Sequence, residues 1–505
     1  MSDLVVSYKD SVYISVDCDK GIAQELSEYF TFKVPGYQFM PTYRNKMWDG
    51  TIKLYNIYKQ ELYAGLEDYV KSFAKERNYS VSFNTPLVPK NDILKEEVEE
   101  YINDTLQPAF KDEILKAYEH QVDAVHHALN NNRCLLLSPT ASGKSLIIYS
   151  LIRKYMEMIP EDKKILIVVP TVSLVTQMYE DFKEYSKADR SFDVAKECHT
   201  VFANQEKINN SKIIISTWQS IYKCGQKYFD NFGAVFGDEC HLFKSKSLTS
   251  IMSKLKSCPY RIGTTGTLDG TQTHKLVIEG LFGSVYDVIK TNELMDKDLL
   301  AKLSIECILL KYTEKTRKEL KGSKYFNELE WLVTNPQRNN FIANLAKNLN
   351  GNTLVLFQLV EKHGKKLVKL IEQICPDHDV HFVYGGTDAD DREKVRKLTE
   401  ENDNAIIVAS YGTFSTGVSI RRLHNIIFAS PSKSRIRVLQ SIGRQLRKSK
   451  YKEKARLYDI GDDLSWKTWI NHTLKHFVER MKIYNKERFE YKTVKINLEE
   501  GEANG

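Results

Sequence analysis

Short apolar runs alternate with longer segments of helical periodicity over most of this chain. The first set of strand patterns comprises residues 134–137, 165–169, 213–215, 234–236 and 261–264. A second set comprises residues 353–357, 380–384, 405–408, 425–429 and 456–460. Strands that alternate with helices form parallel, doubly wound sheets. The pattern therefore predicts an α/β protein with two such domains in tandem, at residues 107–292 and 293–505.

The segments outside these two sets have other patterns. Residues 12–16 and 51–55 alternate apolar and polar side chains, and a helix-like segment at 22–29 lies between them, so residues 1–88 are predicted to form a small N-terminal α+β module. Residues 89–106 are rich in Glu, Asp and Lys and predict a charged linker helix. Residues 466–489 have approximately helical spacing and predict a C-terminal helical extension.

Composition narrows the class of protein. A length of 505 residues suggests three or four domains, and 42% hydrophobic with 28% charged residues is typical of a soluble globular protein. Because the formal net charge is only +7, nucleic-acid binding would have to come from local basic patches. The eight cysteines include no C-x-x-C pair, and no secretory or membrane-spanning pattern is present, so we expect a cytoplasmic location and no membrane association.

Residues 138–145 read SPTASGKS and predict a phosphate-binding loop between a strand and a helix. Backbone amides of such a loop cradle the phosphates of ATP, Lys144 supplies positive charge, and the Ser145 hydroxyl binds Mg²⁺. Ser138 stands where the pattern has its first glycine. The predicted cofactor-binding loop comprises Ser138, Pro139, Thr140, Ala141, Ser142, Gly143, Lys144 and Ser145.

The second motif is the acidic sequence DECH. It begins at Asp238, one residue after the apolar run 234–236. A carboxylate at the carboxyl end of such a strand suits Mg²⁺ binding, and Glu239 would polarise the attacking water. Cys240 and His241 raise the alternative of a zinc site, but neither has partners at zinc spacing, so we exclude it.

Residues 440–447, QSIGRQLR, resemble motif VI of the superfamily-2 helicases, in which arginines reach the γ-phosphate. This resemblance implies two RecA-like domains and catalytic roles for Gln440, Arg444 and Arg447. Gln121 resembles the glutamine that reads adenine in the same family. Other motifs of the series follow in order, and the family uses them to hold nucleic acid: Pro170, Thr171, Gln177, Thr217, Trp218, Gln358, Ser410 and Thr416, with residues 265–267 linking them to the ATP site.

Over nearly the whole chain, the sequence is similar to the UvsW-like recombination helicases of T-even-type bacteriophages, which are DExH enzymes. The letters that carry this resemblance include WDG at 48–50, STWQ at 216–219 and VASYGTFSTGVSI at 408–420; the part beyond Asp463 matches least. The resemblance implies a monomer in the host cytoplasm that acts on branched DNA, with DNA·RNA hybrids such as R-loops as a further substrate. Recombination or single-strand-binding proteins are the implied partners.

The N-terminal module adds a nucleic-acid argument of its own, because residues 33–59 mix cations with aromatic side chains. Aromatic faces can stack on bases while cations meet phosphates, which favours contacts from Arg44, Lys46 and Trp48. Three alternatives stay open at this point: a duplex DNA translocase that never separates strands, an RNA helicase, and a nucleic-acid-binding protein with a degenerate ATPase. The intact Lys144 and Asp238 argue against the last of these.

Overall fold

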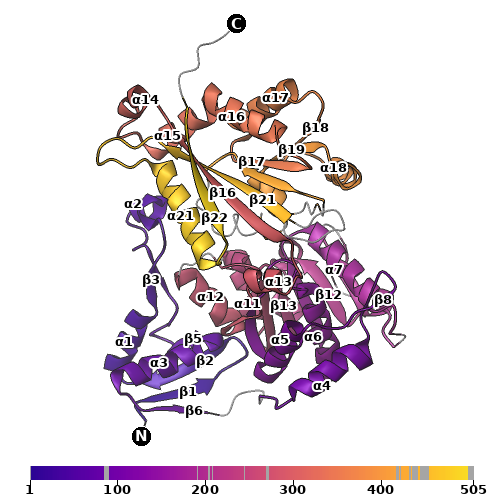
Figure 1. Ribbon diagram of the computed structural model, residues 1–505. Helices are drawn as coiled ribbons and strands as arrows, with labels where there is room; N and C mark the ends of the chain where they lie inside the picture. Colours follow the sequence, from indigo (N-terminus) through magenta and orange to yellow (C-terminus); the bar gives the residue numbers. More distant parts are fainter. Residues whose placement is uncertain are drawn as a thin grey trace. The chain divides into compact units, whose positions relative to one another are not determined.

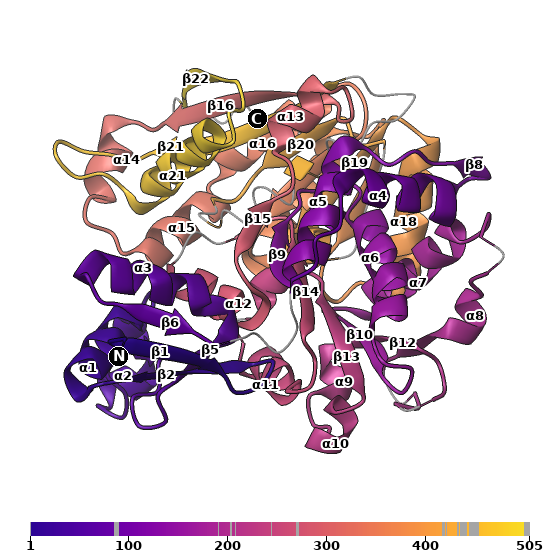
Figure 2. The same cartoon turned by 90° about the horizontal axis from the view of Figure 1, so that it is seen from below.

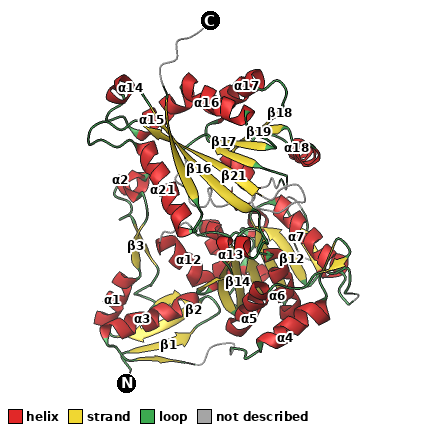
Figure 3. Cartoon of the chain, in the orientation of Figure 1, coloured by secondary structure: helices red, strands yellow, loops and turns green. Residues whose placement is uncertain are grey.

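The computed structural model describes residues 2–84, 90–189, 191–202, 205–207, 209–243, 245–268, 272–416, 420, 422–431, 434, 442–443 and 454–498, with the backbone alone at 272–274, 389–390 and 414–416. The chain divides into two compact units, Met1–Ile289 and Lys290–Gly505. Strands form the centre of each unit, and helices cover them (Figure 3). Each unit is described separately below.

The first unit begins with a four-stranded sheet in the order β5-β2-β1-β6, where β1 pairs antiparallel with β2 and parallel with β6. Its two helices bury Leu26, Val70 and Phe73 against the sheet, and Phe30, which follows the first helix, is buried with them. The elements are β1 (Leu4–Tyr8), β2 (Tyr13–Cys18), α1 (Lys20–Tyr29), β5 (Glu61–Tyr63), η2 (Ala64–Leu66), α3 (Glu67–Arg77) and β6 (Val81–Phe83). The predicted small α+β domain is thereby confirmed.

An arm, defined here as residues 31–53, projects from this module. Its stalk is the antiparallel pair β3 (Thr31–Lys33) and β4 (Thr51–Lys53), and its tip contains the short helices η1 (Tyr37–Phe39) and α2 (Pro41–Arg44). In Figure 1, α2 lies at the end of the stalk that is farther from α1 and the four-stranded sheet.

The rest of the first unit is a seven-stranded parallel sheet in the order β11-β12-β10-β13-β14-β9-β15. All five predicted strands are present, while the two edge strands, β11 and β15, were not predicted. Each is short and only partly apolar, as edge strands can be because one side faces solvent. The strands are β9 (Arg133–Leu137), β10 (Lys164–Val169), β11 (Cys198–Val201), β12 (Ile213–Thr217), β13 (Phe232–Gly237), β14 (Tyr260–Thr265) and β15 (Val285–Asp287).

Helices cover both faces of this sheet, with α5, α6 and α7 on one face and α11 and α12 on the other (Figure 2). The sheet order and this double covering are those of a RecA-like domain. The helices are α5 (Glu119–Asn131), α6 (Lys144–Met158), α7 (Val172–Tyr185), α8 (Val194–Glu197), α9 (Trp218–Ile221), α10 (Gln226–Phe229), η4 (Cys240–Leu242), α11 (Lys246–Lys254) and α12 (Gln272–Phe282).

The predicted linker helix at 89–106 is shorter in the structure. It begins at Lys95 as α4 (Lys95–Glu100), continues as the π-helical η3 (Tyr101–Leu106), and leads to the small hairpin of β7 (Ala109–Phe110) and β8 (Glu113–Ile114). Residues 90–94 belong to no helix or strand, and there the Asn91 side chain donates to the carbonyl oxygen of Leu129 at 2.7 Å and the Ile93 N–H donates to Asn130 Oδ1 at 2.9 Å.

The second unit contains another seven-stranded parallel sheet, in the order β18-β19-β17-β20-β21-β16-β22. The five predicted strands are again present, and β16 and β22 were not predicted. The helix predicted within residues 466–489 is present as α21 (His472–Lys486), and β22 follows it and pairs in parallel with β16. The strands are β16 (Lys302–Lys311), β17 (Thr353–Phe357), β18 (Asp379–Val383), β19 (Ala405–Ser410), β20 (Asn425–Phe428), β21 (Lys454–Asp463) and β22 (Tyr491–Asn497).

This second sheet shares one apolar core with helices that include α16 and α17, and Leu354, Val355 and Phe357 of β17 are fully buried in the unit. The described helices are α13 (Thr291–Asp296), α14 (Glu314–Glu319), α15 (Tyr325–Thr334), α16 (Pro336–Lys347), η5 (Val360–Gly364), α17 (Lys365–Ile374), α18 (Ala389–Glu401), α19 (Tyr411–Thr416) and α21 (His472–Lys486). The chain therefore contains two tandem RecA-like domains and a small N-terminal α+β domain.

Within the first unit, the N-terminal module packs tightly on α12. A Cβ added at Gly65 would lie 2.0 Å from the carbonyl oxygen of Glu279, and one added at Gly280 would lie 2.9 Å from Cβ of Tyr63. Tyr69 donates a hydrogen bond to the Glu279 carboxylate at 2.8 Å, and Glu279 is buried. Apolar residues of the module, of the sheet and of α12 form one continuous core. The module is thus fixed to the domain it precedes.

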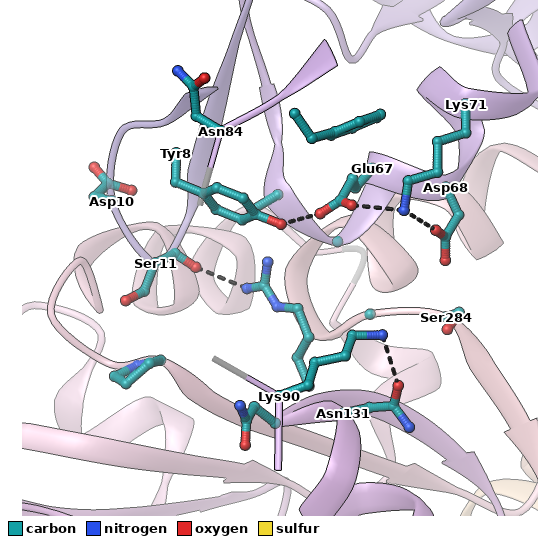
Figure 4. Close-up of a pocket in the computed structure, with 17 residues that line it drawn as sticks. Tyr8, Asp10, Ser11, Glu67, Asp68, Lys71, Asn84, Lys90, Asn131 and Ser284 are labelled. Carbon is teal, nitrogen blue, oxygen red and sulfur yellow. Dashed lines mark hydrogen bonds and ion pairs between the residues drawn. The ribbon is translucent and has the colours of Figure 1, made fainter. Parts of the chain in front are cut away.

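Beside this contact lies a cavity of about 280 Å³ that both parts of the unit line (Figure 4). Arg133 of β9 extends into it and donates to the carbonyl oxygen of Ser11 at 2.8 Å. On the module side, Glu67 accepts hydrogen bonds from Tyr8 and pairs with Lys71 at 2.7 Å. Burial, together with the like charge of Arg261, lowers the pKa of Arg133 to about 9. Polar groups therefore supplement the apolar contact between module and sheet.

We expect Tyr69→Phe to loosen the module without unfolding it. The change removes one hydrogen bond to a buried carboxylate, which is worth about 1.5 kcal/mol, or about a tenfold change in local opening. Hydrogen–deuterium exchange of the α3 amides should therefore be about tenfold faster than in the unchanged protein. Tyr58→Phe is the matched control, since Tyr58 is exposed; exchange that is equal in all three proteins would contradict this role for Tyr69.

Candidate nucleotide and nucleic-acid sites

The SPTASGKS loop connects β9 to α6, as expected for a phosphate loop. Gly143 has φ +80°, a left-handed conformation that glycine adopts without strain, and it caps the N-terminus of the 15-residue helix α6. The loop's N–H groups and the helix dipole favour an anion there. Ser138, the residue that replaces the usual glycine, is fully buried, and its hydroxyl lies 2.5 Å from that of Ser142. The side chain is thus used to close the loop.

Three charged side chains lie together at this loop. Nζ of Lys144 is 3.1 Å from Asp238 Oδ1 and 3.6 Å from Glu239 Oε1. Burial alone would lower the pKa of Lys144, but the two carboxylates raise it above its ordinary value. The lysine is therefore charged at neutral pH and available to an anionic ligand. The structure thus brings together the two motifs that the sequence analysis paired.

Contacts that the sequence did not reveal hold the acidic pair. Thr264, at the end of β14, donates to Asp238 Oδ1 at 2.9 Å, and Nδ1 of His241 lies 3.1 Å from Thr265 Oγ1 and 3.3 Å from Glu239 Oε2. These contacts join the DECH motif to the segment 265–267. Thr264 directly precedes that segment, and its place at the end of an apolar strand was the signal that could have identified it.

Glu239 has a left-handed backbone, with φ of 52°, which is uncommon for a residue with a side chain. Residues held in such conformations cluster at functional sites. The donor set nearby, the Ser145 hydroxyl and the Asp238 carboxylate, consists of hard oxygen atoms of the kind that Mg²⁺ prefers. The residues present therefore fit Mg²⁺ bound together with phosphate oxygens.

Gln121 lies on α5 against the phosphate loop. Its side chain is buried, and Nε2 donates to the carbonyl oxygen of Ser142 at 3.1 Å while Oε1 accepts from the Tyr118 N–H at 2.9 Å. His120 Nε2 lies 3.0 Å from the same carbonyl oxygen. Gln121 thus packs on the loop that would hold the nucleotide, and His120 is a neighbour that the sequence analysis did not single out.

In the first unit, four of the five residues expected to hold nucleic acid lie at the carboxyl ends of two neighbouring strands, and the fifth, Gln177, lies on α7. β10 and β12 pair in parallel and end at Val169 and Thr217. Gln219 Nε2 donates to the Pro170 carbonyl oxygen at 3.3 Å, which joins the two ends. The individual residues differ in exposure: Pro170, Thr171 and Trp218 are half-buried, Thr217 is buried and Gln177 is exposed.

In the second unit, two of the three corresponding residues lie at strand ends. Gln358 follows β17 and Ser410 ends β19, and these two strands pair in parallel with Phe357 opposite Ser410. Ser430, which was not predicted, accepts a hydrogen bond from the Gln358 N–H at 3.2 Å and lies 2.9 Å from Nδ1 of His363. Thr416 ends α19, and its side chain is not among those described.

The remaining predicted residues fall into two groups. Gln440, Arg444 and Arg447 lie outside the described residues. Arg44, Lys46 and Trp48 lie on the tip of the arm; the two cations are exposed, whereas Trp48 is half-buried and donates from Nε1 to the Thr51 carbonyl oxygen at 2.8 Å. Among the other aromatic residues of this region, Tyr55 is buried in the module core.

Three family models match the chain. These are "DNA helicase UvsW, N-terminal" at residues 3–84, "Type III restriction enzyme, res subunit" at 106–270 and "Helicase conserved C-terminal domain" at 337–449. They follow one another in the same order as the module and the two RecA-like domains. In the described residues, every helix is too short or too polar to cross a lipid bilayer.

Similarity to known proteins extends over nearly the whole chain. The ATP-dependent DNA helicase uvsW of Enterobacteria phage T4 is 33% identical over 510 residues, which cover 98% of this chain and 100% of that protein. The DNA 3'-5' translocase XPB2 of Sulfurisphaera tokodaii is 24% identical over 70% of this chain and 83% of its own length. The crystal structure of T4 UvsW superposes with a TM-score of 0.53 at 32% identity, covering 98% of this chain and 100% of that one. The chain therefore belongs to the UvsW family of ATP-dependent, superfamily-2 DNA helicases.

Proposed function

We propose that this helicase uses ATP hydrolysis to remodel branched DNA, such as forks and crossovers, with R-loops as a further substrate. One observation carries the proposal: the compact unit that contains the ATP-site residues also carries an arm with exposed cations, Arg44 and Lys46. An enzyme that acts at a branch has to hold one strand and contact a duplex next to it, which needs two nucleic-acid surfaces. The strand ends and the arm supply two candidates.

In the ATP site, we assign one role to each group. The loop amides and Lys144 hold the phosphates, Ser145 and Asp238 hold Mg²⁺, and Glu239 polarises the attacking water. Mg²⁺, when bound, neutralises charge that develops on the phosphate oxygens. We assign the adenine contact to Gln121, which packs on the loop. For Gln440, Arg444 and Arg447 the proposal rests on the sequence alone, and arginines suit that role because their charge is permanent.

We assign the nucleic-acid track in the first unit to the strand-end residues Pro170, Thr171, Thr217 and Trp218, together with Gln177 of α7. In the second unit, we assign the track to Gln358, Ser410 and Thr416. Hydroxyl, amide and backbone groups of this kind contact phosphates and sugars and do not read bases. Binding by such a track is independent of base sequence and weakens as salt rises.

A second candidate function is translocation along duplex DNA without strand separation. Two findings favour it: the match of residues 106–270 to a restriction-enzyme family and the similarity to a protein described as a DNA translocase. Both candidates use the same ATP site. The two candidates differ in whether the DNA strands are separated, so only a reaction on DNA can distinguish the two functions.

A three-way DNA fork with one labelled strand tests the proposal. We expect ATP-dependent displacement of the labelled strand, and faster ATP hydrolysis with the fork than with a linear duplex of the same length at the same salt concentration. ATP hydrolysis on both substrates without displacement would contradict strand remodelling and favour the translocase. A matched DNA·RNA fork reports whether hybrids are also substrates.

A further inference from the structure

The tip of the arm exposes large apolar side chains that nothing in the ATP site or along the strand ends requires. Phe39 is 73% exposed, Met47 is 79% exposed and Met40 is 37% exposed. Single exposed apolar residues are common on protein surfaces, but several within nine positions at the end of a projecting element indicate an interaction site. The occupant of that site must tolerate contact with apolar groups.

The tip is held rigidly from within. The rings of Tyr37 and Tyr43 pack edge to face with centroids 4.7 Å apart, and the ring of Tyr37 also lies against Gly50. The Val34 N–H donates to the Gly50 carbonyl oxygen at 2.8 Å, which closes the tip above the stalk. Phe39 and Met47 are thus presented by a tip whose other aromatic residues are used for its own packing. A rigid tip can enter a DNA junction without losing much conformational freedom.

Charge on the arm favours nucleic acid over an ordinary protein partner. Residues 31–53, the arm itself, contain four cations and one acidic residue, so this short segment carries a net charge of +3. Arg44 ends α2 and Lys46 follows it, so both cations lie between Phe39 and Met47 in the chain, and both are exposed. Proteins that insert apolar side chains between base pairs combine them with nearby cations, which bind the adjacent phosphates.

We propose that the arm tip is a wedge: Phe39 and Met47 pack on the terminal base pair at the branch point, and Arg44 and Lys46 bind the flanking phosphates. The proposal deepens the branched-DNA function and depends on it. A terminal base pair exists at a branch and not within a continuous duplex, so the wedge would also distinguish branched DNA from a continuous duplex. The cations, by contrast, act on any duplex.

The double variant Phe39→Ser/Met47→Ser tests the wedge. We expect it to open a three-way fork about tenfold more slowly than the unchanged protein, since loss of stacking on one base is worth about that factor. Its affinity for a closed circular duplex, which has no terminal base pair, and its ATP hydrolysis with single-stranded DNA should be unchanged. Tyr58→Ser is the matched control, because Tyr58 is 97% exposed in the same module but lies beyond β4, outside the tip. The conservative variant Phe39→Leu/Met47→Leu should restore much of the fork rate.

A binding measurement without ATP separates failure of the wedge from failure of the proposed function. 2-Aminopurine placed at the branch-point pair should brighten when the unchanged protein binds, and it should not brighten with the double serine variant. Arg44→Ala/Lys46→Ala should weaken binding to fork and linear duplex alike and lower the salt slope by about two. Equal fork rates and equal fluorescence for the double serine variant and the unchanged protein would overturn the wedge. If the unchanged protein brightens the probe but displaces no strand with ATP, the wedge stands and the proposed function fails.

Discussion

Replacing Lys144 with alanine is expected to lower the turnover number for ATP by at least about 100-fold, the usual loss when one preorganised charge is removed from a reacting group. The structure supplies the reason. Lys144 Nζ lies within 3.6 Å of both carboxylates of the DECH motif, so its removal leaves two negative charges in the pocket that has to receive a polyphosphate. Nucleotide binding and transition-state stabilisation should both suffer.

A coupled ATPase assay with saturating single-stranded DNA measures the effect. Lys154→Ala is the control, because Lys154 lies on the same helix α6 but pairs with Glu157 at 2.7 Å on the protein surface. That variant should turn over ATP at the rate of the unchanged protein. Near-normal turnover by Lys144→Ala would show that SPTASGKS is not the phosphate loop.

Glu239→Gln is expected to keep nucleotide affinity within a few-fold and to reduce turnover about 100-fold or more, the range that general-base catalysis contributes. Glutamine preserves the shape of the side chain but removes the charge that orients and polarises water. The protein should still fold, because the change leaves the contacts of Asp238 with Thr264 and Lys144 in place.

Titration with a fluorescent ATP analogue, followed by single-turnover hydrolysis, separates binding from chemistry in this variant. Glu99→Gln on the exposed face of α4 is the matched control and should change neither quantity. If Glu239→Gln instead loses affinity while its single-turnover rate stays normal, Glu239 serves binding, and another group activates the water.

Central strands such as β10 (KILIVV) and β17 (TLVLF) could be predicted from the sequence because each is a nearly continuous apolar run, as burial on both faces requires. Outer strands give a weaker signal. β22 reads YKTVKIN, with charged side chains among the apolar ones and only partial burial, so the pattern did not distinguish it from a polar tail. Only its pairing with β16 makes it a strand, and pairing between distant segments is not visible in a local pattern.

The same limit applies to the candidate sites. Lys144, Asp238 and Glu239 stand in motifs whose spacing reflects their chemistry, and the structure places them together. Thr264 belongs to no recognisable motif. Its hydrogen bond to Asp238 is visible only in the structure, where β14 lies beside β13. In the module, alternation could not tell which aromatic residues face the core. Tyr55 proved to be buried, whereas Phe39, a residue of the same mixed segment, is exposed.

The two glycines at the contact between module and α12 have a consequence for protein engineering. Gly65 and Gly280 allow two backbones to approach so closely that any other residue at Gly65 would collide with the chain opposite. A module moved alone onto another motor domain would meet that domain's own helix, shaped for a different neighbour. A working chimera should therefore exchange residues 1–84 together with α12 as a single cassette, although almost two hundred residues separate them in the sequence.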